Sequence, residues 1–214
     1  MIAVVCPSRG RPERVVKMVA SVLEYSQADV LIYVDKDDVP STRLRFDSER
    51  VVLMIGEPQG RGRAVNALCD TFRQYRGYLV VSDDIVFTRP GWDVELEQGL
   101  DTFSNDIGLV HLKGSDTLQM EGQPWVNWAC VSRNWLDTLG WFNYPELEHF
   151  CQDTVLQILA ESLGRVHHVP QVALHHACID HPEMRSRMMA DAERFLWFCA
   201  KDFGKCLARL RAAM

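Results

Sequence analysis

An apolar run of four strand-favouring residues, Tyr78 to Val81, ends abruptly in Ser82, Asp83 and Asp84. Such a run suits a buried strand of a parallel sheet, with the three polar residues at its carboxyl end, where open α/β sheets bind ligands. Adjacent carboxylates repel each other unless a cation or positive donors lie between them, and their hard oxygens suit Mg²⁺ or Mn²⁺. The alternative is a helix cap or a solvated turn, because Ser and Asp favour both.

Strand-like and helix-like segments alternate along the chain, as they do in a wound parallel sheet. We find no internal repeat, linker or low-complexity tract, and therefore predict one domain spanning residues 1–214. Its expected class is α/β, with a mostly parallel central sheet flanked by helices. The expected strands are 2–6, 30–34, 51–55, 78–81, 108–112 and 165–169, with strand-like material at 124–131; the expected helices are 13–25, 64–75, 92–103 and 147–163, followed by a helical segment from about 182.

Composition narrows the class of protein further. The chain has 214 residues, of which 47% are hydrophobic and 24% charged, and its net charge of -6 argues against nonspecific binding to nucleic acid. Its first apolar run is too short for a signal peptide, and no run approaches the length that spans a bilayer. The seven cysteines include no CxxC pair, which implies neither a disulfide framework nor a zinc knuckle. We therefore expect a cytoplasmic protein.

Motifs at the strand ends carry a family resemblance. They are CPSRGRP after the first strand, VDKDD after the second, GRGRAVN after the third, SDD after the fourth, QDTVLQILAESLG in a later helix and a final ALHH. In this order the chain resembles the GT-A-fold (Rossmann-like) glycosyltransferases, in particular compact, family-2-like and phage-type enzymes. The resemblance implies transfer of a sugar from a nucleotide diphosphate, with UDP expected, and a bound Mn²⁺ or Mg²⁺. Its D-x-D element is here Ser82-Asp83-Asp84, which lacks the first Asp of the strict pattern.

The resemblance also implies a donor site at the strand ends. A metal held by Asp84 would stabilise the charge of the diphosphate leaving group, and Asp83 would bond to the ribose. Backbone amides and guanidinium groups of the first loop can meet phosphates. The alternatives are a solvated basic loop, surface turn acids and an ordinary helix start with flexible glycines. The remaining donor-site candidates are Pro7, Ser8, Arg9, Arg11, Asp35, Asp37, Gly60, Gly62, Arg63, Asn66 and Ser82.

Asp153 matches the acidic residue that the family places at the head of the later helix. An inverting enzyme needs such a carboxylate to take the proton of the acceptor hydroxyl, with Glu146 and Glu148 as the other candidates. The positive end of the helix favours the ionised form, so we expect the pKa of Asp153 to lie low. The alternative is an ordinary N-cap residue. A retaining enzyme would need no base here.

Five histidines occur late in the chain: His167, His168, His175, His176 and His181. His175 and His176 occupy the position where related enzymes complete the metal site, and imidazole is a competent ligand for Mn²⁺ beside carboxylates. Neighbouring residues on a strand point in opposite directions, so one of the two would reach the metal, and we choose His176. A zinc site is disfavoured, because no cysteine spacing of the usual kind accompanies the histidines.

Four of the six tryptophans lie between residues 125 and 146. Tryptophan faces stack on sugars, and the family carries acceptor contacts in this segment, so the resemblance implies an acceptor wall of Trp125, Asn127, Trp128 and Trp141. The alternative is that these side chains only build the core.

Two other functions share this fold class. A sugar-phosphate nucleotidyltransferase would show a longer glycine-rich loop with a Lys after the first strand, and CPSRGRP has none. A noncatalytic nucleotide-sugar-binding protein would have been favoured by loss of Asp84 or Asp153. The acceptor stays open among a saccharide, a lipid-linked sugar and a modified DNA base, the last requiring a basic face from Arg61, Arg63 and the helix at 185–194. The oligomeric state is also open.

Overall fold

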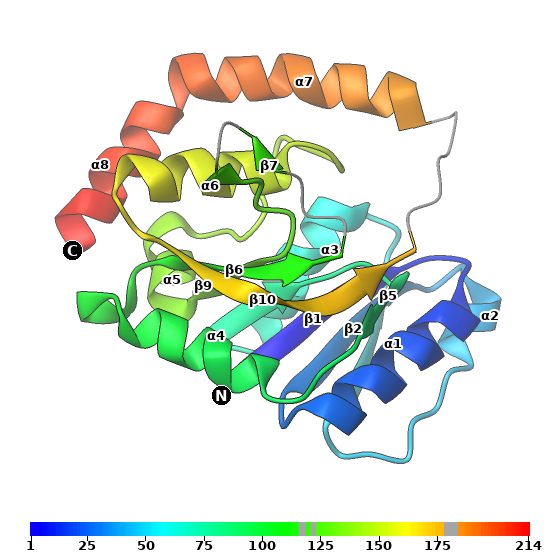
Figure 1. Cartoon of the computed structure of the whole chain (residues 1–214). Helices are drawn as coiled ribbons and strands as arrows, with labels where there is room; N and C mark the ends of the chain where they lie inside the picture. The colour runs from blue at the N-terminus through cyan, green and yellow to red at the C-terminus, as the bar shows by residue number, and fades with distance from the viewer. Residues whose placement is uncertain (116–118, 121–122, 178–183) are drawn as a thin grey trace.

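The computed structural model describes the backbone of residues 1–115, 119–120, 123–177 and 184–214, and side chains except those of 116–124 and 178–186. This part of the chain forms one α/β domain around an eight-stranded sheet with strand order β3-β2-β1-β4-β9-β6-β10-β5 (Figure 1). The strands are β1 (Ile2–Ser8), β2 (Asp29–Asp35), β3 (Val51–Gly56), β4 (Gly77–Val80), β5 (Ile85–Phe87), β6 (Leu109–Gly114), β9 (Ala129–Ser132) and β10 (Val166–His176); β7 (Gln119–Met120) and β8 (Gln123–Pro124) form a separate hairpin.

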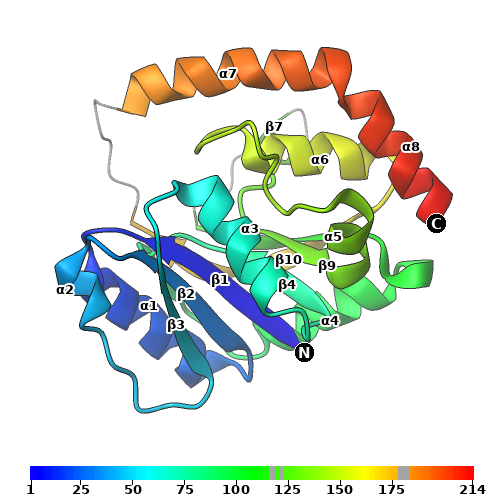
Figure 2. The same cartoon turned by 180° about the vertical axis from the view of Figure 1, so that it is seen from behind.

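Helices cover both faces of the sheet. Side chains of α1 and α4 pack on one face, and those of α3, α5 and α6 pack on the other, with α7 and α8 outside them (Figures 1 and 2). The helices are α1 (Pro12–Tyr25), α2 (Val39–Thr42), α3 (Arg61–Thr71), α4 (Trp92–Asp101), α5 (Arg133–Leu139), α6 (Gln152–Ser162), α7 (Met184–Lys201) and α8 (Phe203–Ala213), with a short 3-10 turn at Ser104–Asp106.

Strand β1 shows why the sequence folds in this way. Its residues alternate between the two faces: Ala3 and Val5 join the core under α3, whereas Val4 and Cys6 join the core under α1, and all four are fully buried. A strand buried on both faces reads as a continuous apolar run. Strands β2 and β4 both pair with β1 in parallel, so the three strands end at the same edge of the sheet. That edge carries the acidic residues singled out in the sequence.

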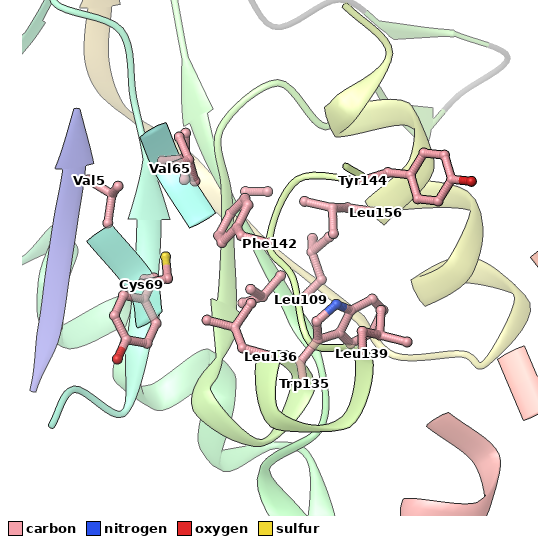
Figure 3. Packing of buried hydrophobic residues seen from close by; sticks show 14 of the residues in the cluster. Val5, Val65, Cys69, Leu109, Trp135, Leu136, Leu139, Phe142, Tyr144 and Leu156 are labelled. Carbon is pink, nitrogen blue, oxygen red and sulfur yellow. The ribbon is translucent and has the colours of Figure 1, made fainter. Parts of the chain in front are cut away.

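A second layer of apolar side chains joins the sheet to α3, α5 and α6. Val5 faces Val65 of α3, and Phe142, Leu136 and Leu156 continue the cluster toward α6 (Figure 3). Each large apolar side chain buried in this way contributes roughly 1.5–3 kcal/mol relative to exposure. This cluster therefore fixes α6, and with it Asp153, relative to the sheet.

The class of fold is as predicted, but several elements differ from expectation. The helix expected at 147–163 begins at Gln152, because Cys151 before it has a left-handed backbone (φ 60°) and residues 142–151 form a loop. The tryptophan-rich segment contains a helix, α5, which Ser132 caps by accepting from the Trp135 N–H at 3.2 Å. The strand expected over 124–131 is confined to β9, which runs antiparallel to both neighbours. The strand expected at 165–169 continues to His176 and pairs there with β5, which was not predicted.

Candidate active site

Ser8 and Asp83 join the ends of two neighbouring strands. Val5 pairs with Val80 in the parallel register of β1 and β4, so both strands deliver their next polar residues to one place. The Ser8 hydroxyl donates to Asp83 Oδ2 at 2.5 Å, and the Arg11 guanidinium lies 3.0 Å from Asp83 Oδ1. Burial raises the pKa of Asp83, although Ser8 and Arg11 oppose that rise. A buried carboxylate therefore lies at the centre of this edge.

Asp84 is paired with His176. The antiparallel register of β10 and β5 sets His176 opposite Ile85, and its Nε2 lies 3.4 Å from Asp84 Oδ1. The Ser82 hydroxyl donates to the same oxygen, and guanidinium nitrogens of Arg11 and Arg14 lie 3.9 and 3.8 Å from Oδ2. Burial alone would raise the pKa of Asp84, but the bonds from His176 and Ser82 outweigh it and hold that pKa well below its ordinary value.

His175 lies on the other side of the strand from His176. Its Nδ1 is 3.1 Å from the Ser115 hydroxyl, in an exposed position. The two histidines thus have different neighbours, as the alternation of side chains along a strand requires. The pairing of His176 with Asp84 depends on β5, a three-residue strand that the sequence analysis missed.

Asp84 and His176 are chemically suited to a divalent cation. An ionised carboxylate and an imidazole nitrogen 3.4 Å apart are two ligands that Mn²⁺ accepts. Within the described residues, no group of three or more His, Cys, Asp or Glu side chains could hold a metal ion. A substrate or water could supply further ligands to a cation here. Mg²⁺ and Mn²⁺ sites beside phosphates are commonly built this way.

Arg9 ties the first loop to the end of β2. Its guanidinium contacts Asp35 Oδ2 at 2.5 Å and Asp37 at 2.7 and 2.8 Å, which lowers the pKa of Asp37. Gly10, with a positive φ of 72°, donates its backbone N–H to Asp38 Oδ2 at 2.6 Å. The predicted residues Arg9, Asp35 and Asp37 therefore form one cluster, and Asp38, which was not predicted, shapes the loop that carries them.

Asp153 lies in a small pocket of about 180 Å³ beside this edge. It is the second residue of α6, where its Oδ1 accepts from the Thr154 N–H at 2.8 Å, and Trp125 also bonds to it. The pocket is lined by Arg61, Val80, Asn127, Ala129, Phe142, Asn143, His149, Phe150, Cys151, Gln152, Asp153 and Leu156.

The low pKa expected for Asp153 is wrong. Burial raises that pKa, and the bonds from Thr154 and Trp125 and the charge of Arg61 only oppose the rise. The positive N-terminal end of α6 favours the ionised form of Asp153, but only through the partial charges of one helical turn. Loss of solvent around the half-buried carboxylate disfavours the ionised form, and this effect is the larger one. The same desolvation, together with Arg61 and Arg187, lowers the pKa of His149 in this pocket to about 4.

Asn66 holds the wall of the pocket. Its Oδ1 accepts the backbone N–H groups of Phe142 and Asn143, both at 2.9 Å, and its Nδ2 donates to the Asn143 carbonyl at 2.8 Å. Asn66 was predicted to meet the nucleotide, but its amide is engaged with this backbone. Arg63, three residues before Asn66 on the same helix, is exposed.

Asp191 of α7 holds the next part of the loop. Its fully buried carboxylate accepts three successive backbone N–H groups, from Glu148 at 3.0 Å, His149 at 2.8 Å and Phe150 at 2.7 Å. Burial alone would raise the pKa of Asp191, but these donors and Arg194 keep it below its ordinary value. Arg194 also lies 3.1 Å from Glu148, one of the two fallback bases, which is exposed.

The predicted acceptor wall is divided between three places. Trp125 and Asn127 reach the pocket, Trp128 is buried against the His176 ring at a centroid distance of 5.1 Å, and Trp141 packs on Tyr144 at 5.6 Å. Three residues that sequence reasoning did not place in the site are Arg61, His149 and Asp191. The signal for Arg61 was its position directly after Gly60, whose φ of 77° starts α3 beside the pocket.

A wider hollow of about 630 Å³ lies at the opposite end of the sheet, near Arg76 before β4. Its charges are already paired, with Arg76 2.7 Å from Asp101 and 2.6 Å from Asp106. In open α/β sheets the ligand site lies at the carboxyl ends of the strands. We therefore place the candidate active site at Asp83, Asp84 and Asp153.

Comparison with known proteins relates this geometry to one fold. No protein-family model matches the chain. No curated protein matches it either. Among solved structures, glucosyl-3-phosphoglycerate synthase from Mycobacterium tuberculosis, in complex with Mn²⁺, UDP and phosphoglyceric acid, superposes with a TM-score of 0.67 at 15% identity, covering 93% of this chain and 78% of that one.

Two further structures agree. Mannosyltransferase PcManGT from Pyrobaculum calidifontis, in complex with GDP-Man and Mn²⁺, has a TM-score of 0.63 at 13% identity, covering 99% of this chain and 73% of that one. Residues 1–349 of TarS from S. aureus superpose with a TM-score of 0.61 at 10% identity, covering 94% of this chain and 73% of that one. The chain has the GT-A fold of these glycosyltransferases. At such identities the likeness establishes the fold, and the activity has to be argued from the site.

Proposed function

We propose that this chain is a glycosyltransferase that moves a sugar from a nucleotide-diphosphate donor, with UDP as the expected nucleotide, to a hydroxyl acceptor. The observation that carries the proposal is the grouping at one sheet edge of the Asp84–His176 pair, 3.4 Å apart, with Asp153 in the pocket beside it. Solved structures of the same fold contain UDP or GDP-Man together with Mn²⁺, which supports the assignment.

Asp84 and His176 would hold the divalent cation. When bound, the cation would supply positive charge to the diphosphate leaving group. Arg11, which lies 3.0 Å from Asp83 and 3.9 Å from Asp84, adds a guanidinium that can bind phosphate directly. We assign Asp83 and Ser82 to the ribose side, and Pro7, Ser8, Arg9, Asp35 and Asp37 to the nucleoside side. Arg63 stays a predicted nucleotide contact, and Asn66 would act by positioning Phe142 and Asn143.

Asp153 would accept the proton of the attacking hydroxyl in an inverting reaction. A general base is most effective when its pKa approaches the working pH, and burial moves the pKa of Asp153 in that direction. The pocket of about 180 Å³ is smaller than ordinary ligand pockets, so it suits one end of an acceptor. Trp125 and Asn127 would border that end.

Titration calorimetry of UDP and of GDP, with and without Mn²⁺, tests the donor site. We expect one nucleotide to bind only with Mn²⁺, and Asp84→Ala to abolish that binding. In the matched variant Asp153→Asn, nucleotide binding should remain while sugar transfer or donor hydrolysis falls by roughly 10²–10⁴-fold. Absence of nucleotide binding with Mn²⁺ present would remove the basis of the proposal. Full turnover in Asp153→Asn would instead overturn only the role of the base.

A further inference from the structure

Helix α7 presents an apolar face to the outside of the molecule. The helix lies beyond α6 in both views (Figures 1 and 2), and its inner face contributes the buried residues Asp191 and Phe198. Of the twelve large hydrophobic side chains exposed on the described chain, four belong to α7, with Leu196 and Met189 each 68% exposed and Trp197 49% exposed. The outer face of α7 is made by seven exposed residues, all apolar except Glu193: Met188, Met189, Ala192, Glu193, Leu196, Trp197 and Ala200.

Cations line one side of this face. Arg187, Arg194 and Lys201 follow one another at intervals of seven residues, which places them in one row along the helix. Residues 184–214 contain seven Lys and Arg against three Asp and Glu, whereas the whole chain carries a net charge of -6. The C-terminal helices are therefore a basic segment on an acidic protein. An apolar face beside a row of cations is typical of a helix that lies in the plane of a membrane surface.

We propose that the outer face of α7 docks on an anionic lipid bilayer. Leu196, Met189 and Trp197 would enter the boundary between headgroups and acyl chains, and Arg187 and Lys201 would bind lipid phosphates. Between Arg187 and Lys201, Glu193 is the one exposed acid. Its negative charge would be repelled by anionic lipid and therefore weakens the contact. The described chain has no helix whose length and apolar character would let it cross a bilayer, so the contact is peripheral.

Charge favours a bilayer over the other occupants of such a face. In a two-fold antiparallel pairing of α7 with a second copy, each flank meets its own counterpart, which sets Arg187 near Lys201 of the other copy. Like charges would then repel across the dimer. A nucleic-acid site would carry Lys and Arg at its centre to bind phosphates, whereas the cations of α7 lie beside an apolar face. Nucleic acid is therefore the less suitable occupant.

Docking through α7 also indicates a class of acceptor, and this step rests on the proposed function. The inner side of the same helix carries Asp191, which holds residues 148–150 at the pocket of Asp153. A bilayer against the outer face would thus lie one helix away from the proposed base. The acceptor that fits this arrangement is a sugar or hydroxyl carried on a lipid.

Vesicle flotation tests the docking without any sugar donor. The full chain should float with vesicles of equal parts phosphatidylglycerol and phosphatidylcholine, and remain unbound with phosphatidylcholine alone. Salt should weaken binding, and Leu196→Glu with Trp197→Glu should weaken it at least about tenfold. Val94→Glu is the matched control, because Val94 is 52% exposed on α4, away from this face. Its flotation should equal that of the parent chain.

Three results would overturn the docking proposal. They are no flotation with anionic vesicles, flotation that persists in the double Glu variant, and a dimer in light scattering that this variant converts to monomer. UDP binding measured on the same variants separates the two proposals. Retained nucleotide binding with lost flotation assigns the effect to the outer face of α7, and flotation without binding of either UDP or GDP in the presence of Mn²⁺ would refute the donor site alone.

Discussion

The strand-end cluster of Ser8, Asp83, Asp84 and His176, here called the donor edge after its proposed role, and the pocket wall, residues 142–151, are built in different ways. At the donor edge, Ser8 and Asp83 lie within a few residues of paired strands, so the register of β1 and β4 places them. At the pocket wall, residues 142–151 have no strand or helix of their own, and side chains from other elements hold them. Asn66 of α3 binds one part of that backbone, and Asp191 of α7 binds another.

The pKa values of Asp84 and Asp153 are shifted in opposite directions, whereas the pKa of Asp83, beside Asp84, is raised like that of Asp153. Arg9 lowers the pKa of Asp37, and His176 and Ser82 keep that of Asp84 low, so these two carboxylates are ionised and Asp84 can attract a cation. Burial raises the pKa of Asp153 in the pocket. One site thus contains a carboxylate that keeps its negative charge, Asp84, and a carboxylate that favours protonation, Asp153.

The largest expected effect comes from removing the carboxylate that holds the pocket wall. Asp191→Ala would leave the N–H groups of Glu148, His149 and Phe150 without their acceptor, which we expect to cost about 3 kcal/mol of unfolding free energy. Sugar transfer should fall through kcat, while Mn²⁺-dependent UDP binding at the donor edge stays unchanged. Urea unfolding, kinetics and calorimetry on one preparation measure the three quantities.

Glu193→Ala is the control for that variant. Glu193 is exposed on the same helix, two residues from Asp191, and its loss should change stability by less than about 0.5 kcal/mol. If Asp191→Ala matched Glu193→Ala in stability and kcat, the pocket wall would not depend on side-chain contacts, and the contrast between the two regions would fail.

A smaller effect is expected where α3 approaches the pocket wall. A Cβ on Gly62 would lie 2.9 Å from the Leu147 carbonyl and 3.0 Å from Gln152 Nε2, so Gly62→Ala must displace backbone. We expect a cost of roughly 1–3 kcal/mol. Gly204→Ala, on α8 with nothing within 4 Å of its Cβ, should be neutral or stabilise by up to about 1 kcal/mol. Thermal unfolding of both variants tests these expectations. Equal melting temperatures would show that the pocket wall can shift to accommodate the added methyl group of Gly62→Ala.

Sequence reasoning predicted that Asp83 and Asp84 lie at the end of a buried strand because the signals for this are local. The run before Ser82 is apolar, the acids follow at once, and β1, β2 and β3 lie within two or three residues of the expected bounds. Strand alternation implied that only one of His175 and His176 would reach the metal, and the structure sets the chosen His176 beside Asp84; its metal role stays a prediction. Nothing in the sequence marked β5, whose three residues are too few for a periodic pattern.

The pocket wall could not be predicted because its signals are distant. Asp191 lies 41 to 43 positions from the backbone it binds, and Asn66 lies 76 and 77 positions from the N–H groups it accepts. Only tertiary structure brings such partners together. For the same reason the pKa of Asp153 was predicted with the wrong sign: the helix end is visible in the sequence, and the depth of burial is not.

The smallest expected effect is a pH dependence of opposite sign in the two regions. The folded-state pKa of Asp153 lies above its ordinary 3.8, so the folded state binds that proton more tightly than the unfolded state. The free energy of unfolding therefore decreases as pH rises from 3.8 through the raised pKa. Above that raised pKa, the full cost of burying the ionised Asp153 carboxylate is present. Asp153→Asn removes the cost, and we expect it to be more stable than the parent chain at pH 7.

Asp37→Asn supplies the opposite case at the donor edge. Arg9 lowers the folded-state pKa of Asp37 below 3.8, so its contribution is present above that pH and is lost as pH falls through the lowered value. This variant should be less stable than the parent chain at pH 7, by a small amount because Asp37 is half-exposed and solvent screens the pair. Urea unfolding between pH 8 and about pH 2 measures both differences and covers the range in which the contribution of Asp37 is lost. The gain in Asp153→Asn should shrink toward pH 4, and a stability loss in that variant at pH 7 would show that the pocket favours the ionised carboxylate after all.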